Sequence, residues 1–238
     1  MIELKIGSTR IIFTDRRDGV SPPPYDSANL GLSVGDNEKN VRENRERLAR
    51  RVGLSDPSGW QFLDQVHGGE VVEVDRPNKG MAVRSGDAAV TATAGQVLAV
   101  LTADCAPVVI VGDSAFAVVH AGWKGLLAGV VANSVNTLRS RGVNIRQAVL
   151  GPCIHPINYE FGLDDLKLLA KTLGNEVIGT TSSGAPALDL PSAVRSAVAA
   201  ARVESFTDVG ICTASSADYF SFRRDGVTGR QALVAVME

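Results

Sequence analysis

Residues 97–125 read VLAVLTADCAPVVIVGDSAFAVVHAGWKG, and this stretch decides the fold. It contains three runs rich in valine and alanine, at 97–103, 107–111 and 115–120, separated by Asp, Pro or Gly. Such runs are typical of buried β-strands. Directly after them, apolar residues at positions 127, 131, 135 and 138 predict a helix over 125–141, which Gly142 would end.

The flanking sequence adds strands and helices on both sides of this stretch. Strands are expected at 10–14, 60–66, 70–74, 146–150, 176–180, 207–213 and 231–236. Helices are expected from Asp36 or Asn37 to about residue 52, at 163–173, and at 191–202 with Pro191 in its first turn. Residues 15–36 form a long loop of the kind that is usually functional or mobile. Because strands cluster ahead of helices, we predict an α+β fold with mixed β-sheets flanked by helices.

Composition narrows the class of protein. The chain has 238 residues, of which 45% are hydrophobic, with no repeat or low-complexity segment, so we predict a single domain over residues 1–238. Lys+Arg 24 against Asp+Glu 26 gives a formal charge of -2, which argues against a nucleic-acid partner. No signal peptide or membrane span is recognisable. Three cysteines without a CxxC pair indicate a reducing, cytoplasmic location. We expect a monomer or a homodimer.

Histidine and cysteine carry the candidate chemistry. The chain has three histidines; His67 and His120 each close an apolar run, and Cys105 lies just past another. Two imidazoles and one thiolate match a catalytic zinc site with an open fourth position, where zinc would lower the pKa of water to about 7. The alternative is that each is an ordinary core or surface residue, since their spacing matches no short metal motif.

Three motifs in this order resemble a known family. They are Gln65-Val-His-Gly68, Ala103-Asp-Cys-Ala-Pro-Val108 and His120-Ala-Gly-Trp-Lys-Gly125. They resemble the proteins first described as multicopper polyphenol oxidases or laccase-domain proteins, a family now associated with purine nucleoside phosphorylase and adenosine deaminase activity and including a bacterial peptidoglycan-editing factor. Matching segments run along nearly the whole chain: Asn29-Leu-Gly31, Val34-Gly-Asp36, Asn44-Arg45, Leu150-Gly-Pro152, Tyr159-Glu160, Leu188-Asp-Leu190, Cys212-Thr213, Phe220-Ser-Phe-Arg-Arg-Asp225 and Gly229-Arg230.

The resemblance implies a cofactor and substrates. His67, Cys105 and His120 would hold Zn²⁺, with copper as a possible substitute. Inorganic phosphate would be the co-substrate, and the purine nucleosides adenosine, inosine, guanosine and methylthioadenosine would be the substrates. The substrate-binding candidates are Asn29, Arg45, Gln65, Trp123 and Lys124.

Several of these residues have a second interpretation. Asp104 could orient a ligating histidine or shuttle a proton, although a direct role beside Cys105 needs a bend in the strand. Arg45 and Lys124 could contact phosphate or be solvated charges, and the family often has Arg at position 124. Trp123 could stack on a purine or pack over the sheet end.

The same choice between function and structure arises at other positions. Arg223 and Arg224 could contact a ligand or have only a structural role, and surface exposure would argue against a functional one. Cys153 and His155 are interpreted as loop residues near the site, with metal ligation as the alternative. Trp60, Phe62 and Leu63 are predicted to be core.

Two other classes of function remain open at this point. Cys105 as nucleophile and His120 as base would make a cysteine hydrolase that edits a peptidoglycan precursor. A non-catalytic envelope or assembly partner could use Trp123 or the Pro-rich loop Ser21-Pro-Pro-Pro-Tyr25 as its contact surface. Three histidines cannot furnish the roughly ten imidazoles of a four-copper oxidase, which leaves only a single-copper polyphenol oxidase as a copper alternative.

Overall fold

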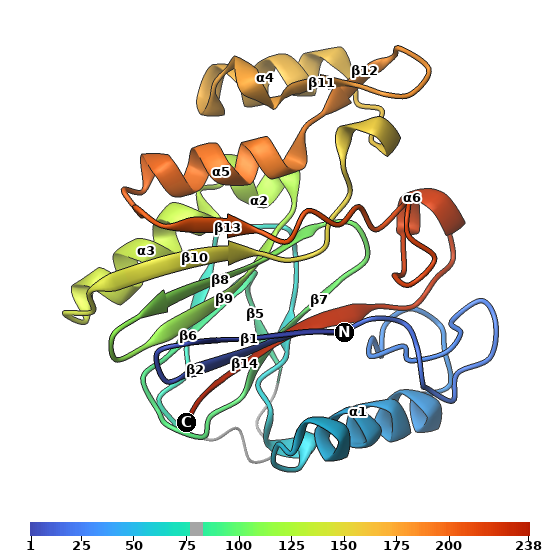
Figure 1. Cartoon of the computed structure of the whole chain (residues 1–238), viewed down its shortest axis with the longest axis vertical. Coiled ribbons are helices and arrows are strands. Elements are labelled where there is room, and N and C mark those ends of the chain that lie inside the picture. Colours follow the sequence, from blue (N-terminus) through green and yellow to red (C-terminus); the bar gives the residue numbers. More distant parts are fainter. Residues whose placement is uncertain (77–82) are drawn as a thin grey trace.

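A six-stranded sheet forms the centre of the computed structural model, which describes residues 1–76 and 83–238 (Figure 1). Its strands, in order across the sheet, are β13 (Phe206–Asp208), β10 (Ile145–Leu150), β8 (Ala106–Gly112), β9 (Phe116–Ala121), β6 (Ala88–Thr91) and β4 (Val71–Glu73). β10–β13 and β4–β6 pair in parallel, and the other neighbours pair antiparallel. The sheet is therefore mixed, as the sequence predicts.

A second, antiparallel sheet packs against one face of the first. It contains β1 (Ile2–Ile6), β2 (Thr9–Phe13), β14 (Gln231–Met237) and β7 (Leu98–Thr102) in that order. Successive side chains of a strand point to opposite faces. In β8, Val109 and Val111 accordingly join the core between the two sheets, whereas Val108 and Ile110 point to the other face. Burial on both faces explains why β8 is a continuous apolar run.

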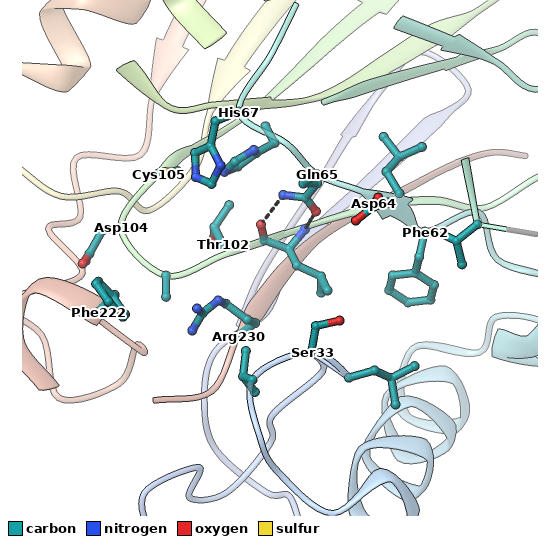
Figure 2. Close-up of a pocket in the computed structure, with 18 of the residues that line it drawn as sticks. Ser33, Phe62, Asp64, Gln65, His67, Thr102, Asp104, Cys105, Phe222 and Arg230 are labelled. Atoms are coloured by element: carbon teal, nitrogen blue, oxygen red, sulfur yellow. Dashed lines mark hydrogen bonds between the residues drawn. The ribbon is translucent and has the colours of Figure 1, made fainter. Parts of the chain in front are cut away.

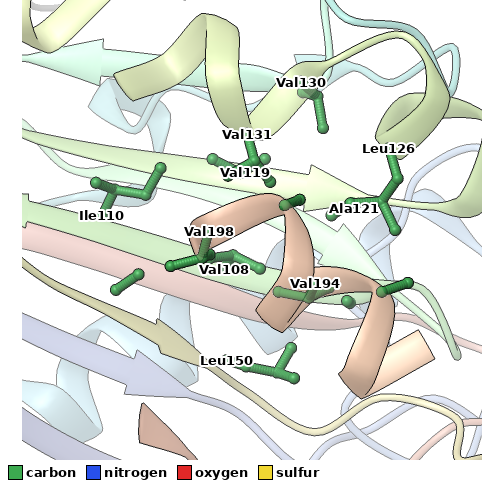
Figure 3. Packing of buried hydrophobic residues seen from close by; sticks show 14 of the residues in the cluster. Val108, Ile110, Val119, Ala121, Leu126, Val130, Val131, Leu150, Val194 and Val198 are labelled. Atoms are coloured by element: carbon green, nitrogen blue, oxygen red, sulfur yellow. The ribbon is translucent and has the colours of Figure 1, made fainter. Parts of the chain in front are cut away.

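Helices cover the two outer faces of this pair of sheets. On the six-stranded side lie α2 (Trp123–Leu127), α3 (Val130–Ser140), α4 (Leu163–Leu173) and α5 (Leu190–Ala200). Val131 and Val194 reach from two of these helices toward the sheet (Figure 3). α1 (Glu38–Val52) covers the outer face of the four-stranded sheet through Ala49 and Val52. The protein thus has four layers, which are the group of four helices, the six-stranded sheet, the four-stranded sheet and α1 (Figure 1).

Short elements complete the fold. They are α6 (Phe222–Asp225), the strand pairs β3 (Leu63–Asp64) with β5 (Arg84–Ser85) and β11 (Ile178–Thr180) with β12 (Pro186–Leu188), and 3₁₀ turns at Pro57–Gly59, Pro156–Asn158 and Asn175–Val177. Asn37 caps α1 by accepting from the Lys39 N–H. Among the described residues, no helix is long and apolar enough to cross a membrane.

The structure corrects four predicted elements. The helix expected over 125–141 is two helices, α2 and α3, because Gly129 adopts φ 75° between them. The strand at 60–66 shrinks to β3, with Gln61 forming an isolated bridge to Leu98. The strand at 207–213 ends at Asp208, and the one at 176–180 begins as a 3₁₀ turn. The elements β1, β5, β6, β12 and α6 lie in segments for which the sequence predicted no helix or strand.

Candidate active site

His67, Cys105 and His120 meet at one end of the central sheet. Their candidate ligand atoms all lie within 4.8 Å of one another, and the two imidazole centroids are 4.8 Å apart. Pairing of β8 with β9 places Pro107 opposite His120, so the turn that carries Cys105 lies beside the end of β9. His67 approaches from the loop after β3 and appears next to Cys105 in Figure 2. Pairing of β8 with β9, together with the loop after β3, thus brings together three residues that are far apart in the sequence.

A buried carboxylate, Asp87, contacts both histidines. Its Oδ1 lies 2.8 Å from His120 Nδ1 and accepts a hydrogen bond of 2.9 Å from the His67 N–H. Its Oδ2 accepts from the N–H groups of Gly68 at 2.6 Å and Val66 at 3.2 Å. Because a carboxylate only accepts, Nδ1 of His120 is the donor and Nε2 is the nitrogen left for ligation.

Glycines let the surrounding motifs approach this centre. A Cβ on Gly122 would lie 3.0 Å from His67 Cδ2 and 3.2 Å from Cys105 Sγ. A Cβ on Gly69 would lie 2.4 Å from the Ala128 carbonyl oxygen, at the break between α2 and α3. Gly122 of the His120 motif and Gly69, which directly follows the His67 motif, are therefore required by the close packing of these segments.

Electrostatics favours a charged Cys105. Burial by itself would raise the pKa of its thiol, but the charge of His120 and hydrogen bonds from His120 and His67 lower that pKa to about 6. Burial likewise opposes the charged form of His120, while Cys105 and Asp87 raise its pKa to about 9. A thiolate at neutral pH is the form that ligates metals or attacks electrophiles.

The three residues line a cavity of about 710 Å³ (Figure 2). This volume falls within the range of small-molecule sites, about 300–1,000 Å³. Three arginines (Arg45, Arg223, Arg230) and three aromatic residues (Phe62, Tyr159, Phe222) contribute to its wall. The other lining residues are Gly31, Leu32, Ser33, Val34, Leu63, Asp64, Gln65, Val83, Leu101, Thr102, Ala103 and Asp104.

The cavity arginines donate to backbone carbonyls. Arg45 donates through Nε and Nη2 to Leu30 O and lies 3.7 Å from the centroid of the Phe62 ring; burial lowers its pKa to about 10. Arg223 donates to Glu160 O, and Arg230 donates to the carbonyls of residues 228 and 229. Within the described ranges, none of the three pairs with a carboxylate. Their positive charge is available to an anionic ligand.

Two of the predicted site residues line the cavity, but their side chains are hydrogen-bonded to other parts of the protein. Gln65 exchanges two hydrogen bonds of 2.8 Å with the backbone of Leu101 (Figure 2). Asp104 adopts φ 94°, the bend that its predicted role requires, but its carboxylate accepts from Thr213 Oγ1 and the Arg223 N–H, both at 2.6 Å. The histidine contact expected of Asp104 is made by Asp87 instead.

Three predicted substrate-binding residues lie away from the cavity. Asn29 is fully buried and bonds to Gly31, Asp36 and the Arg230 N–H, so it shapes the loop. Trp123 packs edge-on against Phe161, at a centroid distance of 5.4 Å, and Lys124 is exposed. Neither belongs to the cavity lining.

The remaining assignments divide between core and cavity. Cys153 is fully buried in the core, where burial raises the pKa of its thiol well above the usual value, and His155 is not part of the metal-ligand group. Trp60 and Leu63 are buried as predicted. Phe62 is a correction: it lines the cavity beneath Arg45.

Sequence reasoning missed Asp87 and gave no role to the aromatic residues of the wall. The sequence signal for Asp87 is weak: a Gly86-Asp87 pair ahead of an apolar run. Tyr159, Phe222 and Arg230 lie in segments that matched the family, but their convergence on one wall follows only from the fold.

Comparisons with known proteins identify the family of this chain. Residues 10–238 match the family model "Multi-copper polyphenol oxidoreductase laccase". The chain is 41% identical over 234 residues to "Purine nucleoside phosphorylase ORF3" of Streptomyces griseus, covering 95% of this chain and 93% of that protein. It is 38% identical over 221 residues to "Purine nucleoside phosphorylase YfiH" of Escherichia coli (strain K12), covering 91% and 89%.

Solved structures give the same result. Neisseria meningitidis protein NMB0706 superposes with a TM-score of 0.89 at 32% identity, covering 100% of this chain and 98% of that one. YlmD from Geobacillus stearothermophilus gives a TM-score of 0.89 at 31% identity, covering 97% and 92%. The chain therefore belongs to the multi-copper polyphenol oxidoreductase laccase family, together with the relatives named purine nucleoside phosphorylase.

Proposed function

We propose that this protein is a metal-dependent purine nucleoside phosphorylase that also deaminates adenosine. The observation that carries the proposal is the meeting of a thiolate and two imidazoles on the wall of a cavity whose guanidinium groups have no carboxylate partner among the described residues. Relatives named purine nucleoside phosphorylase, 41% and 38% identical to this chain, support the same class of enzyme.

The donor set fits a borderline divalent ion. Cys105 supplies sulfur, His67 and His120 supply imidazole nitrogen, and a fourth position is left for a reactant, which is the ligand set of a catalytic zinc site. Zn²⁺ is the proposed resident ion, and copper can take its place because Cu²⁺ binds such ligands more tightly. When bound, the ion supplies a Lewis acid and lowers the pKa of water.

The rest of the cavity suits the two substrates of a phosphorolysis. Arg45, Arg223 and Arg230 lack carboxylate partners among the described residues, so inorganic phosphate can take that place. Phe62 and Phe222 offer aromatic faces to a purine. The proposed nucleosides are adenosine, inosine, guanosine and methylthioadenosine.

The proposed role of Asp104 is to position Arg223. Its carboxylate accepts from the Arg223 backbone, which holds that guanidinium at the cavity wall. A proton-shuttling role would require one of its two hydrogen bonds to break first. Asp104→Asn should therefore raise the KM for phosphate more than it lowers kcat.

The test separates the two reactions by their products. Zinc-loaded protein is incubated with adenosine, with and without phosphate, and the products are separated by liquid chromatography. Adenine that forms only with phosphate supports phosphorolysis, and inosine formed in either case supports deamination. No turnover by a sample shown by metal analysis to contain zinc refutes both. His67→Gln is the loss-of-metal variant, and Lys124→Ala, which changes an exposed side chain outside the cavity, is the matched control.

One observation favours a second candidate, a cysteine hydrolase that edits a peptidoglycan precursor. Cys105 lies beside His120, and the lowering of its pKa to about 6 makes it a nucleophile at neutral pH. A nucleophile forms a covalent adduct with substrate and works after chelation, whereas a metal ligand does neither. Mass spectrometry of Cys105 during turnover, with and without chelator, distinguishes the two. Oxidation of a phenol by the copper-loaded protein would identify a single-copper polyphenol oxidase instead.

A further inference from the structure

We propose that Asp87 is the positioning residue of the metal centre: one buried carboxylate fixes the ligating nitrogen of His120 and the backbone turn that presents His67. This inference rests on the metal centre proposed above. It concerns a residue that touches neither the cavity nor the proposed ion directly.

The first step is the orientation of His120. Asp87 Oδ1 lies 2.8 Å from Nδ1, and the Asp87 carbonyl oxygen accepts from the His120 N–H at 2.7 Å. The ring and its backbone are thus held by the same residue. A ligating histidine whose other ring nitrogen donates to a carboxylate has a fixed tautomer and a more basic ligating nitrogen.

The second step concerns His67, which is held by a turn. His67 has φ 60°, a left-handed conformation that is uncommon for a residue with a side chain. Three consecutive N–H groups, those of Val66, His67 and Gly68, all donate to the Asp87 carboxylate. Successive amides that converge on one anion stabilise such a turn, so this carboxylate sets the direction from which His67 enters the site.

The third step concerns the hydrogen bonds of the Asp87 side chain. Its side chain is fully buried, and in the described part of the chain its partners are the 66–68 amides and His120. An amide side chain at position 87 cannot accept all four of these hydrogen bonds, because its nitrogen only donates. Asp87→Asn therefore either frees the His120 ring or releases the His67 turn.

Asp104 provides a matched control. It is also a buried carboxylate, adjacent to Cys105 in sequence and in a left-handed conformation, with φ 94°. Its hydrogen bonds go to Thr213 and the Arg223 backbone and not to either histidine. Asp104→Asn thus removes a comparable buried charge next to the site without altering the orientation of the histidine ligands.

The experiment compares zinc affinity in the two variants. The dissociation constant for Zn²⁺ is measured by competition with a chromophoric chelator, and the Co²⁺ absorption spectrum reports ligand geometry. The unfolding free energy of each metal-free variant is measured in urea. Asp87→Asn should weaken zinc binding by about 10- to 100-fold and alter the cobalt spectrum, as second-sphere changes do. Asp104→Asn should leave both unchanged even where it destabilises the metal-free fold.

A measurement on the unaltered protein keeps the inference testable if Asp87→Asn does not fold. With three histidines in the chain, ¹⁵N-imidazole spectra of the zinc-loaded protein can be assigned individually. His120 should carry its proton on Nδ1 and bind through Nε2. Binding through Nδ1, or equal zinc affinity in wild type and a folded Asp87→Asn, would overturn the role of Asp87 alone. A wild type that binds no zinc would overturn the metal centre as well.

Discussion

Replacing Gly122 by alanine should damage the metal centre while leaving the fold intact. Gly122 precedes α2 with φ −75° and ψ 165°, angles that alanine adopts freely. Its new Cβ would lie 3.0 Å from His67 Cδ2 and 3.2 Å from Cys105 Sγ, both inside ordinary contact distance. One of the two ligands must therefore shift by a few tenths of an ångström.

The size of the expected loss in zinc affinity follows from how little the ligand distances of a metal site can vary. Ligand distances in such sites hold to about 0.2 Å, so a shift larger than this breaks the geometry. Zinc affinity should fall by at least about tenfold, as when a neighbour that orients a ligand is altered. Stability should barely change: loss of a glycine N-cap costs about 0.5–1 kcal/mol, and the stiffer unfolded chain returns about 0.4–1 kcal/mol.

Gly162→Ala is the matched control. Gly162 is also an N-cap in extended conformation, with φ −64° and ψ 135° before α4. Apart from its chain neighbours, nothing in the described part of the chain lies within 4 Å of the position of its Cβ. Zinc titration and urea unfolding are carried out on both variants. Equal zinc affinity in Gly122→Ala, Gly162→Ala and wild type would refute the argument that steric room at Gly122 shapes the site.

Three further predictions concern the core, the cavity and the cysteines. Leu138→Ala should lower the unfolding free energy, measured in urea, by about 2–5 kcal/mol because Leu138 is fully buried. The control is Leu168→Ala at a half-exposed position, which should change the unfolding free energy by no more than about 0.5 kcal/mol. Equal losses in the two variants would contradict this packing. Arg45→Lys should raise the KM for phosphate about tenfold, because lysine lacks the planar guanidinium that can donate to Leu30 O and to the ligand at the same time. An unchanged KM would mean that phosphate binds elsewhere. Iodoacetamide should modify Cys212 well before Cys153, as followed by mass spectrometry. Burial opposes the Cys212 thiolate, but hydrogen bonds from Ser215, His155 and Asn158 lower its pKa below that of an ordinary thiol. Its alkylation should therefore rise at a lower pH than that of a free thiol measured alongside, and a rise at the same or a higher pH would contradict this.

Regular hydrophobic patterns made much of the fold predictable. The apolar run at 107–111 corresponds to β8, and the helix predicted at 163–173 is α4 with the same bounds. The prediction of one continuous helix over 125–141 was wrong because the apolar spacing continues across Gly129. The break falls at Gly129, with φ 75°, and next to it the Asn133 side chain donates to Gly69 O, which lies far away in the sequence. No local pattern encodes that contact.

The candidate site was predictable only where its residues lie at strand ends in recognisable motifs. His67, Cys105 and His120 meet these conditions, and their proximity was anticipated. Asp87 does not, because its importance comes from hydrogen bonds to residues 19 to 33 positions away. Asn29 differs in another way: its motif was assigned to substrate binding, and in the structure its side chain is buried and accepts from the Arg230 N–H.

The central position of β14 has a consequence for engineering this protein. β14 pairs with β2 on one side and with β7 on the other, and Arg230 of the cavity directly precedes it. A deletion that begins at residue 231 would strip two neighbours of their hydrogen-bonding partner at once and leave two sheet edges able to recruit other chains. Versions shortened in this way should aggregate before they lose secondary structure.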